Sequence, residues 1–150
     1  MRLIIMEKPK MGRAVADYLG VIKSRSNYIE TKGGIVAWLR GHVLEQAPPG
    51  AYGAGRFPGP PSDLPILPKK WILNVCEDTK GLLDTVKSLV ERKDVTEIVN
   101  GGDPDREGQM LVDEVLEFIG NSSAHFWFFH DKQSHYCPFV CAKLSTKTNG

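Results

Sequence analysis

The stretch that decides the fold is VTEIVNGGDPDREGQMLVDEVL, residues 95–116. Its first part, 95–99, is short and rich in branched apolar side chains, which is typical of a buried strand. Two glycines then break the strand, and an acidic turn follows. From Arg106 onward apolar residues recur at helical spacing until Gly120, a residue that commonly ends helices. The stretch therefore predicts a strand, a polar loop and an amphipathic helix.

The same order of strand and helix occurs twice more in the chain. Residues 2–6 (RLIIM) predict a buried strand, and the following helix begins near Pro9 and ends at Gly20. Residues 71–75 predict a further strand, and 79–92 have the apolar spacing of an amphipathic helix. Alternation of strands and helices predicts an α/β fold with a mostly parallel sheet flanked by helices.

Two features interrupt this alternation. The strand-like pieces 28–32 and 35–39 are joined by a pair of glycines, which predicts an inserted β-hairpin over about 28–39. Residues 47–70 are rich in proline and glycine and predict a long loop. Loops of this length in compact domains often carry function, although composition alone favours a solvated connection.

Composition restricts the class of protein. The chain has 150 residues, of which 41% are hydrophobic and 25% charged, and its net charge is +1. These values are normal for a globular domain, and no stretch approaches the roughly 18 apolar residues of a membrane helix. Residues 1–6 are too short for a signal-peptide core, so we expect a cytoplasmic protein with no membrane partner. The odd cysteine count (Cys76, Cys137 and Cys141) then indicates reduced thiols.

Acidic residues follow two of the predicted strands. Glu7 comes directly after 2–6, and Asp103 and Asp105 come after 95–99. If the two strands are parallel neighbours, these carboxylates meet at the carboxyl edge of the sheet. Asp103 and Asp105 are two apart in an extended segment and so point the same way, while Glu107 falls in the first turn of the next helix.

Clustered carboxylates repel one another unless a hard cation binds them or one of them is protonated. Mg2+ suits such a site because it accepts a few carboxylates and keeps several waters, which leaves room for a phosphate. Lys8 and Arg106 lie within the same motifs and would hold that phosphate. From spacing alone, a solvated acidic turn that caps a helix is an equally good interpretation.

At these residues the sequence resembles the toprim domain of type IA DNA topoisomerases, in particular the bacterial topoisomerase III branch. The matching segments are MRLIIMEKP at the start, GHVLEQAPPGAY at 41–52, DLPILPKKW at 63–71 and GGDPDREGQMLVDEVL at 101–116. They follow one another in the order of the family. The resemblance predicts a toprim domain over 1–121 and a divergent tail over 122–150.

The resemblance implies a Rossmann-like toprim fold and ATP-independent passage of one DNA strand through a transient break in another. It implies that Glu7 takes part in proton transfer near the scissile phosphate. It also implies that Glu7, Asp103 and Asp105 bind Mg2+ and that Glu107 completes the catalytic acidic set. The expected partners are DNA with single-stranded regions and the C-terminal domains of the enzyme.

The resemblance further implies contacts with DNA. Lys8 and Arg106 would bind phosphates and assist catalysis, and His42 would lie near the DNA. Family members usually carry an aromatic residue, often tryptophan, shortly before the DLP motif. Here the nearest aromatic residue is Phe57, which is the candidate for that contact.

The tyrosine nucleophile of the family lies in a separate domain far beyond toprim. None of the four tyrosines here stands in such a context: Tyr18, Tyr28, Tyr52 and Tyr136. We therefore expect a fragment that does not relax DNA alone. The alternatives are a stand-alone toprim nuclease, a nucleic-acid-binding module, or a folded remnant without activity.

The tail departs most from the family pattern. It combines histidines and cysteines that form a loose zinc-like set: His125, His130, His135, Cys137 and Cys141. The usual paired Cys-x2-Cys arrangement is absent from this set, so ordinary tail residues are the better interpretation. A strand over 124–129 and a weak helix over 132–144 are the predicted elements.

Overall fold

A six-stranded sheet forms the centre of the protein, in the strand order β2-β3-β4-β1-β7-β8. The structure is a computed structural model that describes residues 1–52, 68–103, 105–121 and 125–127. The strands of this sheet are β1 (Arg2–Met6), β2 (Val21–Ser24), β3 (Tyr28–Thr31), β4 (Gly34–Trp38), β7 (Glu97–Gly101) and β8 (His125–Trp127). β1 pairs in parallel with β4 and β7, and β7 with β8, while β2, β3 and β4 are antiparallel. The predicted α/β class is confirmed, with a parallel centre and an antiparallel edge.

The middle strand, β1, is buried on both faces. Leu3 and Ile5 pack into one apolar cluster, and Ile4 and Met6 pack into another on the opposite face. Successive side chains of a strand point to opposite faces, so a strand covered on both sides must be apolar throughout. This requirement explains the uninterrupted run of apolar residues in β1.

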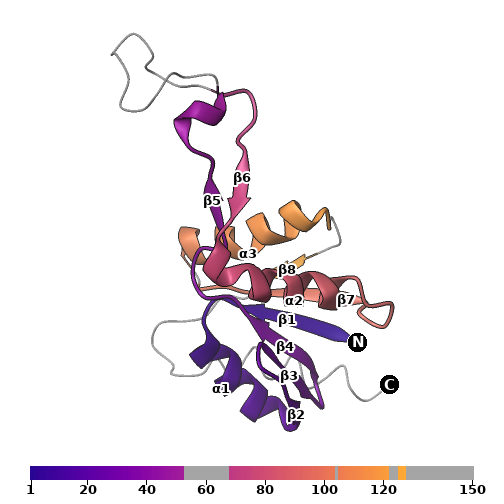
Figure 1. Cartoon of the computed structure of the whole chain (residues 1–150). Helices are drawn as coiled ribbons and strands as arrows, with labels where there is room; N and C mark the ends of the chain where they lie inside the picture. Colours follow the sequence, from indigo (N-terminus) through magenta and orange to yellow (C-terminus); the bar gives the residue numbers. More distant parts are fainter. Residues whose placement is uncertain (53–67, 104, 122–124, 128–150) are drawn as a thin grey trace.

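Helices cover the two faces unequally (Figure 1). α1 (Pro9–Leu19) packs on the face that holds Ile4 and Met6. α2 (Lys80–Val90) and α3 (Arg106–Ile119) pack chiefly on the other face, where Val86 and Val112 join the core. Consequently the helices that follow the neighbouring strands β1 and β7 lie on opposite sides of the sheet. In open α/β sheets, such a switch in direction opens a crevice at the carboxyl ends of the strands.

The predicted hairpin is present as β3 and β4, and sequence analysis missed the edge strand β2 before it. The residues of β2 are all exposed, so the strand has no apolar alternation to reveal it. The turn between β3 and β4 needs glycine because Gly34 has φ +139, and a side chain there would meet the backbone oxygen of Arg2 at 2.5 Å. The glycine pair thus allows the hairpin to lie against β1.

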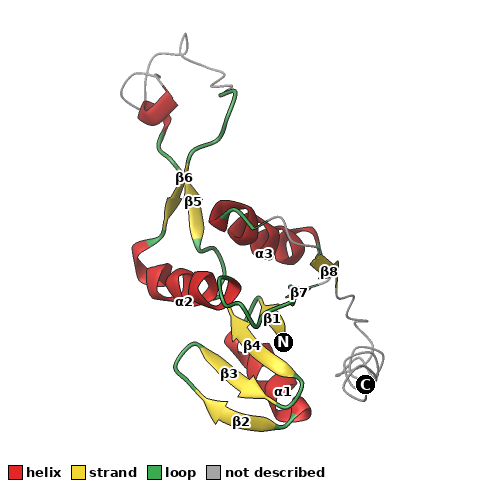
Figure 2. Ribbon diagram, turned by 90° about the vertical axis from the view of Figure 1, so that its right-hand side faces the viewer, coloured by secondary structure: helices red, strands yellow, loops and turns green. Residues whose placement is uncertain are grey.

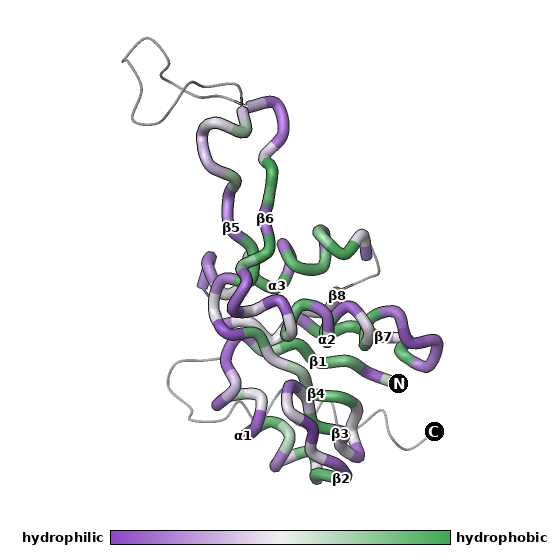
Figure 3. Tube along the Cα trace, in the orientation of Figure 1, coloured by the Kyte–Doolittle hydropathy of each residue, from purple (hydrophilic) through white to green (hydrophobic). Residues whose placement is uncertain are grey.

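A two-stranded arm projects from the body (Figure 2). It pairs β5 (Leu44–Gln46) with β6 (Leu73–Val75) in antiparallel register, and β5 was not predicted from the sequence. The strand predicted over 71–75 is therefore real but shorter. A 3-10 turn, Pro49–Tyr52, lies within the segment predicted as a long loop. In Figure 3 most of β1 has the green colour of hydrophobic residues, as do the outer residues of β6. These apolar residues are the signal by which the sequence analysis recognised both strands.

Other boundaries differ by a few residues. β7 ends two residues later than the predicted strand, and α2 is preceded by a 3-10 turn, Glu77–Thr79. β8 extends the sheet beyond residue 121, where sequence analysis placed the end of the domain. The helix predicted over 132–144 lies outside the described residues. Among the residues described, no helix is long and apolar enough to cross a membrane.

The contact between α1 and β4 gives a stability prediction. Gly12 of α1 lies so close to Trp38 that an added Cβ would be 2.7 Å from the ring. Gly12→Ala is expected to destabilise the protein by about 1–3 kcal/mol because the ring must move. Urea unfolding measures this change. The control is Gly81→Ala in α2, where no atom lies within 4 Å; that change is expected to stabilise by about 0.5–1 kcal/mol. Equal effects at both positions would contradict the close contact.

Candidate metal and phosphate site

The candidate site lies at the carboxyl ends of β1 and β7, which are parallel neighbours as expected from the sequence. Their register places Met6 beside Gly101, so the residues that follow the two strands come together. Glu7 is only 8% exposed, and its Oε2 accepts a hydrogen bond of 3.2 Å from the backbone nitrogen of Asp103. A buried carboxylate is thereby held against the loop that follows β7.

Lys8 joins the two acidic residues. Its Nζ lies 2.6 Å from Oδ2 of Asp103 and 3.1 Å from Oε1 of Glu7. The hydrogen bond with Asp103, followed by that with Glu7, raises the pKa of Lys8 above its ordinary value. The Lys8 ammonium therefore lies between the two carboxylates. Both carboxylates face the position that its nitrogen occupies, and this position is the centre of the candidate site.

Asp105 has the helix-capping role that the sequence analysis gave as one of two interpretations of the acidic turn. It is the N-cap of α3, and its Oδ1 accepts a hydrogen bond of 2.7 Å from the backbone nitrogen of Gly108. Such a cap satisfies a free helix amide, and a carboxylate there also interacts favourably with the helix dipole. Within the described ranges, no three His, Cys, Asp or Glu residues form a group that could hold a metal ion. The structure thus brings together Glu7 and Asp103, with Asp105 at the adjacent helix end.

Of the remaining predicted residues, Glu107 and His42 contact each other. Glu107 lies in the first turn of α3 and is exposed, and its Oε1 is 3.4 Å from Nε2 of His42. His42 belongs to the segment between β4 and β5, so this contact brings the base of the arm to the start of α3. Arg106 is the first residue of α3 and is exposed to solvent. Phe57 lies outside the described residues.

Two amides that sequence analysis did not single out shape the acidic loop. Asn100 is fully buried; its Oδ1 accepts from the nitrogen of Gly102, and its Nδ2 donates to Asp113 and to the carbonyl of Gln109. Gln109 Nε2 in turn donates to the carbonyls of Gly102 and Asp103. The signal for Asn100 was a polar residue at the end of an apolar strand, where burial requires hydrogen-bond partners.

Two glycines allow the close packing of this loop. A Cβ on Gly102 would lie 2.1 Å from the backbone oxygen of Gly108. A Cβ on Gly108 would lie 2.6 Å from both the Asp103 nitrogen and Glu7 Oε2. Gly108 therefore leaves the space in which the Glu7 carboxylate reaches the loop.

The pair of carboxylates fits a cation. Lys8 already places a positively charged nitrogen within hydrogen-bonding distance of both, and carboxylate oxygens are the ligands that Mg2+ prefers. The neighbouring Lys8 and Arg106 supply positive charges for a phosphate. The arrangement is chemically suited to holding a divalent cation beside a phosphodiester.

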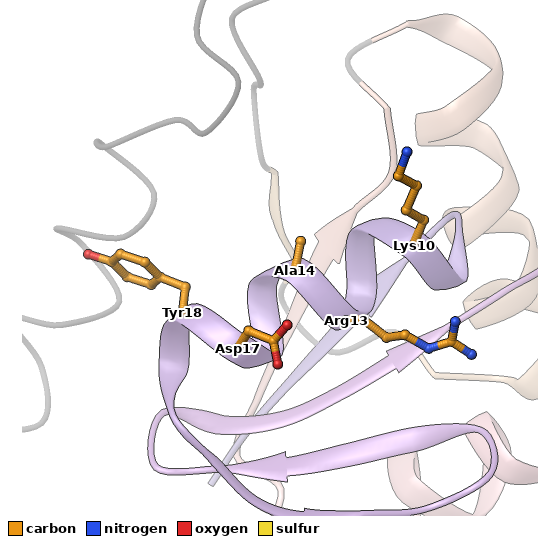
Figure 4. A pocket seen from close by; sticks show the side chains of 5 residues that line it. All are labelled: Lys10, Arg13, Ala14, Asp17 and Tyr18. Atoms are coloured by element: carbon orange, nitrogen blue, oxygen red, sulfur yellow. The ribbon is translucent and has the colours of Figure 1, made fainter.

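A hollow of about 450 Å³ lies elsewhere, on the outer face of α1 (Figure 4). It is lined by Lys10, Arg13, Ala14, Asp17 and Tyr18. A single carboxylate among two basic side chains is a poor metal site. Arg13 is also engaged with Trp38, whose ring centre lies 5.6 Å from the guanidinium carbon. The hollow is thus chemically separate from the acidic site.

Most residues of the alternative zinc set lie outside the described part of the chain: His130, His135, Cys137 and Cys141. Of the fifth, His125, only the backbone is described, in β8.

The sheet has a parallel centre, and acidic residues follow two of its central strands. In the Asp-x-Asp turn, the second aspartate caps the next helix. This is the arrangement of a toprim domain. A family model of the Toprim domain matches residues 2–130, and the chain belongs to this family.

The curated relatives narrow the comparison to one kind of enzyme. The chain is 44% identical over 121 residues to a protein named DNA topoisomerase 3 from Salmonella typhimurium, and 42% identical over 125 residues to that from Haemophilus influenzae. A third, from Staphylococcus epidermidis, is 38% identical over 119 residues. These alignments cover 79%, 82% and 79% of this chain but only 18%, 19% and 17% of the relatives. The chain therefore spans less than a fifth of their length.

The packing around Gly108 gives a second prediction. Gly108→Ala is expected to destabilise the protein by about 1–3 kcal/mol, because the new methyl group displaces Glu7 or the Asp103 backbone. The better helix propensity of alanine, worth about 1 kcal/mol, offsets only part of this loss. Urea unfolding beside Gly81→Ala separates packing from propensity. A stabilised Gly108→Ala protein would show that the Glu7 carboxylate does not occupy this space.

Proposed function

We propose that this chain is the Mg2+-binding toprim part of a type IA DNA topoisomerase of the topoisomerase III kind. Such an enzyme breaks and rejoins single DNA strands without ATP. The observation that carries the proposal is the parallel register of β1 and β7, which brings Glu7 against Asp103, with Lys8 bonded to both. Identity of 34–44% to proteins named DNA topoisomerase 3 supports the choice of reaction.

Glu7 and Asp103 would hold the ion, with Asp105 as a further carboxylate at the adjacent end of α3. Bound Mg2+ supplies neutralisation of the negative charge on the phosphoryl oxygens. The Lys8 ammonium lies between the same carboxylates, so Lys8 and a divalent cation compete for this point. A displaced Lys8 is then available to bind a phosphate oxygen.

The chemistry proposed for the chain is support of a transesterification. A tyrosine oxygen, supplied by a part of the enzyme other than this domain, forms a bond to phosphorus, and the bond to the leaving oxygen breaks. The tyrosine releases its proton to solvent, and the leaving oxygen takes up a proton. Glu7, which is then protonated and released from the ion, is the group proposed to supply that proton and to take it back on rejoining. Arg106 and Glu107 lie in the first turn of α3, where His42 contacts Glu107, and these three residues are proposed to position the DNA.

Metal binding tests the site directly. Asp103→Asn is expected to weaken Mg2+ binding at least tenfold, because it removes a charged ligand. Lys8→Met is expected to strengthen it severalfold, because it removes the competing ammonium. Isothermal titration calorimetry measures both affinities. The control is Asp84→Asn, an exposed carboxylate on α2 that should leave the affinity unchanged. Unaltered affinity in Asp103→Asn, or weaker binding in Lys8→Met, would refute the proposed position of the ion.

Activity is tested in a chimera. Residues 1–121 of this chain replace the matching segment of the Salmonella typhimurium enzyme, to which the chain is 44% identical over 121 aligned residues. The chimera is expected to relax supercoiled plasmid in the presence of Mg2+. Glu7→Gln in the chimera is expected to slow relaxation about 10²- to 10⁴-fold, the usual contribution of a proton-transfer group.

The isolated chain provides the comparison. With plasmid and Mg2+ it is expected to give no relaxed closed circles, because no nucleophilic tyrosine is assigned within it. Nicked circles that depend on Glu7 would favour the alternative of a toprim nuclease. A chimera that folds and binds Mg2+ but does not relax DNA would count against the topoisomerase proposal.

A further inference from the structure

The arm formed by β5 and β6 carries a second group of exposed residues. Its base is fixed to the body: Leu44 is buried, and the nitrogen of Cys76 donates to the carbonyl of Val43 at 3.0 Å. Pairing continues outward to a bond of 2.8 Å from the nitrogen of Ala47 to the carbonyl of Ile72. Figures 1 and 2 both show the arm standing away from the sheet and helices. Side chains on its outer part are therefore open to a partner.

Trp71 is held in place on this arm although half of it is exposed. Its ring meets that of Tyr52 edge to face, with 5.7 Å between centres and 78° between planes. The Tyr52 hydroxyl accepts from the nitrogen of Ile72 at 3.0 Å and donates to its carbonyl at 3.2 Å. These two hydrogen bonds hold the backbone beside Trp71 in place, while Trp71 itself is 52% exposed to solvent. An ordered, exposed indole is a preformed stacking surface.

Positive charge lies directly beside this surface. Lys69 and Lys70 precede Trp71 and are both exposed. The acidic residues near the arm lie closer to the body: Glu45 in β5, and Glu77 and Asp78 after β6. The outer part of the described arm is therefore basic and aromatic.

We propose that Lys69, Lys70, Trp71 and Tyr52 form a binding site for single-stranded nucleic acid. Sites of this kind combine lysines on the phosphates with aromatic rings on which bases stack. Lysine is depleted in the cores of protein–protein interfaces, which argues against a protein partner here. The choice of DNA as the physiological ligand rests on the proposed function.

The position of the arm relates this site to the carboxylates. The arm begins just after His42, which lies 3.4 Å from Glu107 at the start of α3. In this proposal, a strand held on the outer arm runs along the arm toward the start of α3. This site is separate from the acidic site and needs no metal ion.

The test is binding of fluorescein-labelled dT12, measured by anisotropy over a range of salt concentrations. Trp71→Ala is expected to weaken binding about 5- to 150-fold, the usual effect of removing a stacking ring, and Trp71→Phe is expected to keep most of the affinity. Lys69→Ala with Lys70→Ala is expected to reduce the salt slope by about 1.4, because each phosphate contact on a single strand contributes about 0.7.

Matched controls lie on the opposite side of the molecule. Tyr18→Ala removes an aromatic ring that is 60% exposed on α1, and Lys23→Ala with Lys32→Ala removes two exposed charges, one from β2 and one from the turn between β3 and β4. Neither should change the affinity or the salt slope. Arm variants that bind dT12 like the wild type, or controls that weaken it equally, would overturn the proposal.

Two further readouts separate the possible failures. Mg2+ titration of the same proteins reports on the acidic site: loss of binding in Asp103→Asn together with indifference of dT12 to the arm variants would reject the arm site and keep the proposed function. Sedimentation velocity detects the protein-interface alternative. A Trp71→Ala protein that changes its self-association but not its dT12 affinity would also reject the nucleic-acid site.

Discussion

The parallel pairing of β1 with β7 sets the position of every group in the acidic site. Because Met6 lies beside Gly101, the chain leaves both strands at the same level, and Glu7 reaches the amide of Asp103. The pairing is held by apolar side chains on both faces of the sheet, and the ion pair between Arg2 and Glu97 joins the two strands in the same register. The polar geometry of the site is therefore fixed by hydrophobic packing.

Around this register, the loop after β7 is folded by backbone contacts that leave no room for larger side chains. Asn100 is buried beneath it and bonds to Gly102, while Gly108 leaves space for the Glu7 carboxylate. The Asp105 cap begins α3 in the same turn. The Asp-Pro-Asp-Arg-Glu-Gly motif thus combines two requirements: it starts a helix, and it holds one carboxylate beside the end of β1.

The two sites proposed to act on nucleic acid are separate in space. Charge is concentrated at the carboxyl ends of β1 and β7, where Lys8 lies between Glu7 and Asp103. The ordered aromatic surface lies on the arm, outside the sheet. The segment through His42 joins the two, so the proposed binding and cleavage functions depend on one connection.

The sequence by itself determined the strands and helices with apolar periodicity, the hairpin with its two glycines, and the acidic motifs after two strands. It predicted that Glu7 and Asp103 meet if their strands are parallel neighbours, and the structure shows that the strands are. It did not reveal β2 or β5, which are short and largely exposed, so that pairing rather than burial pattern makes them strands. Only the tertiary structure decided that Lys8 sits between the carboxylates, that Asp105 caps α3, and that Tyr52 packs against Trp71. These contacts join residues distant in the chain or choose between two uses of one side chain, and local sequence pattern carries no information on either.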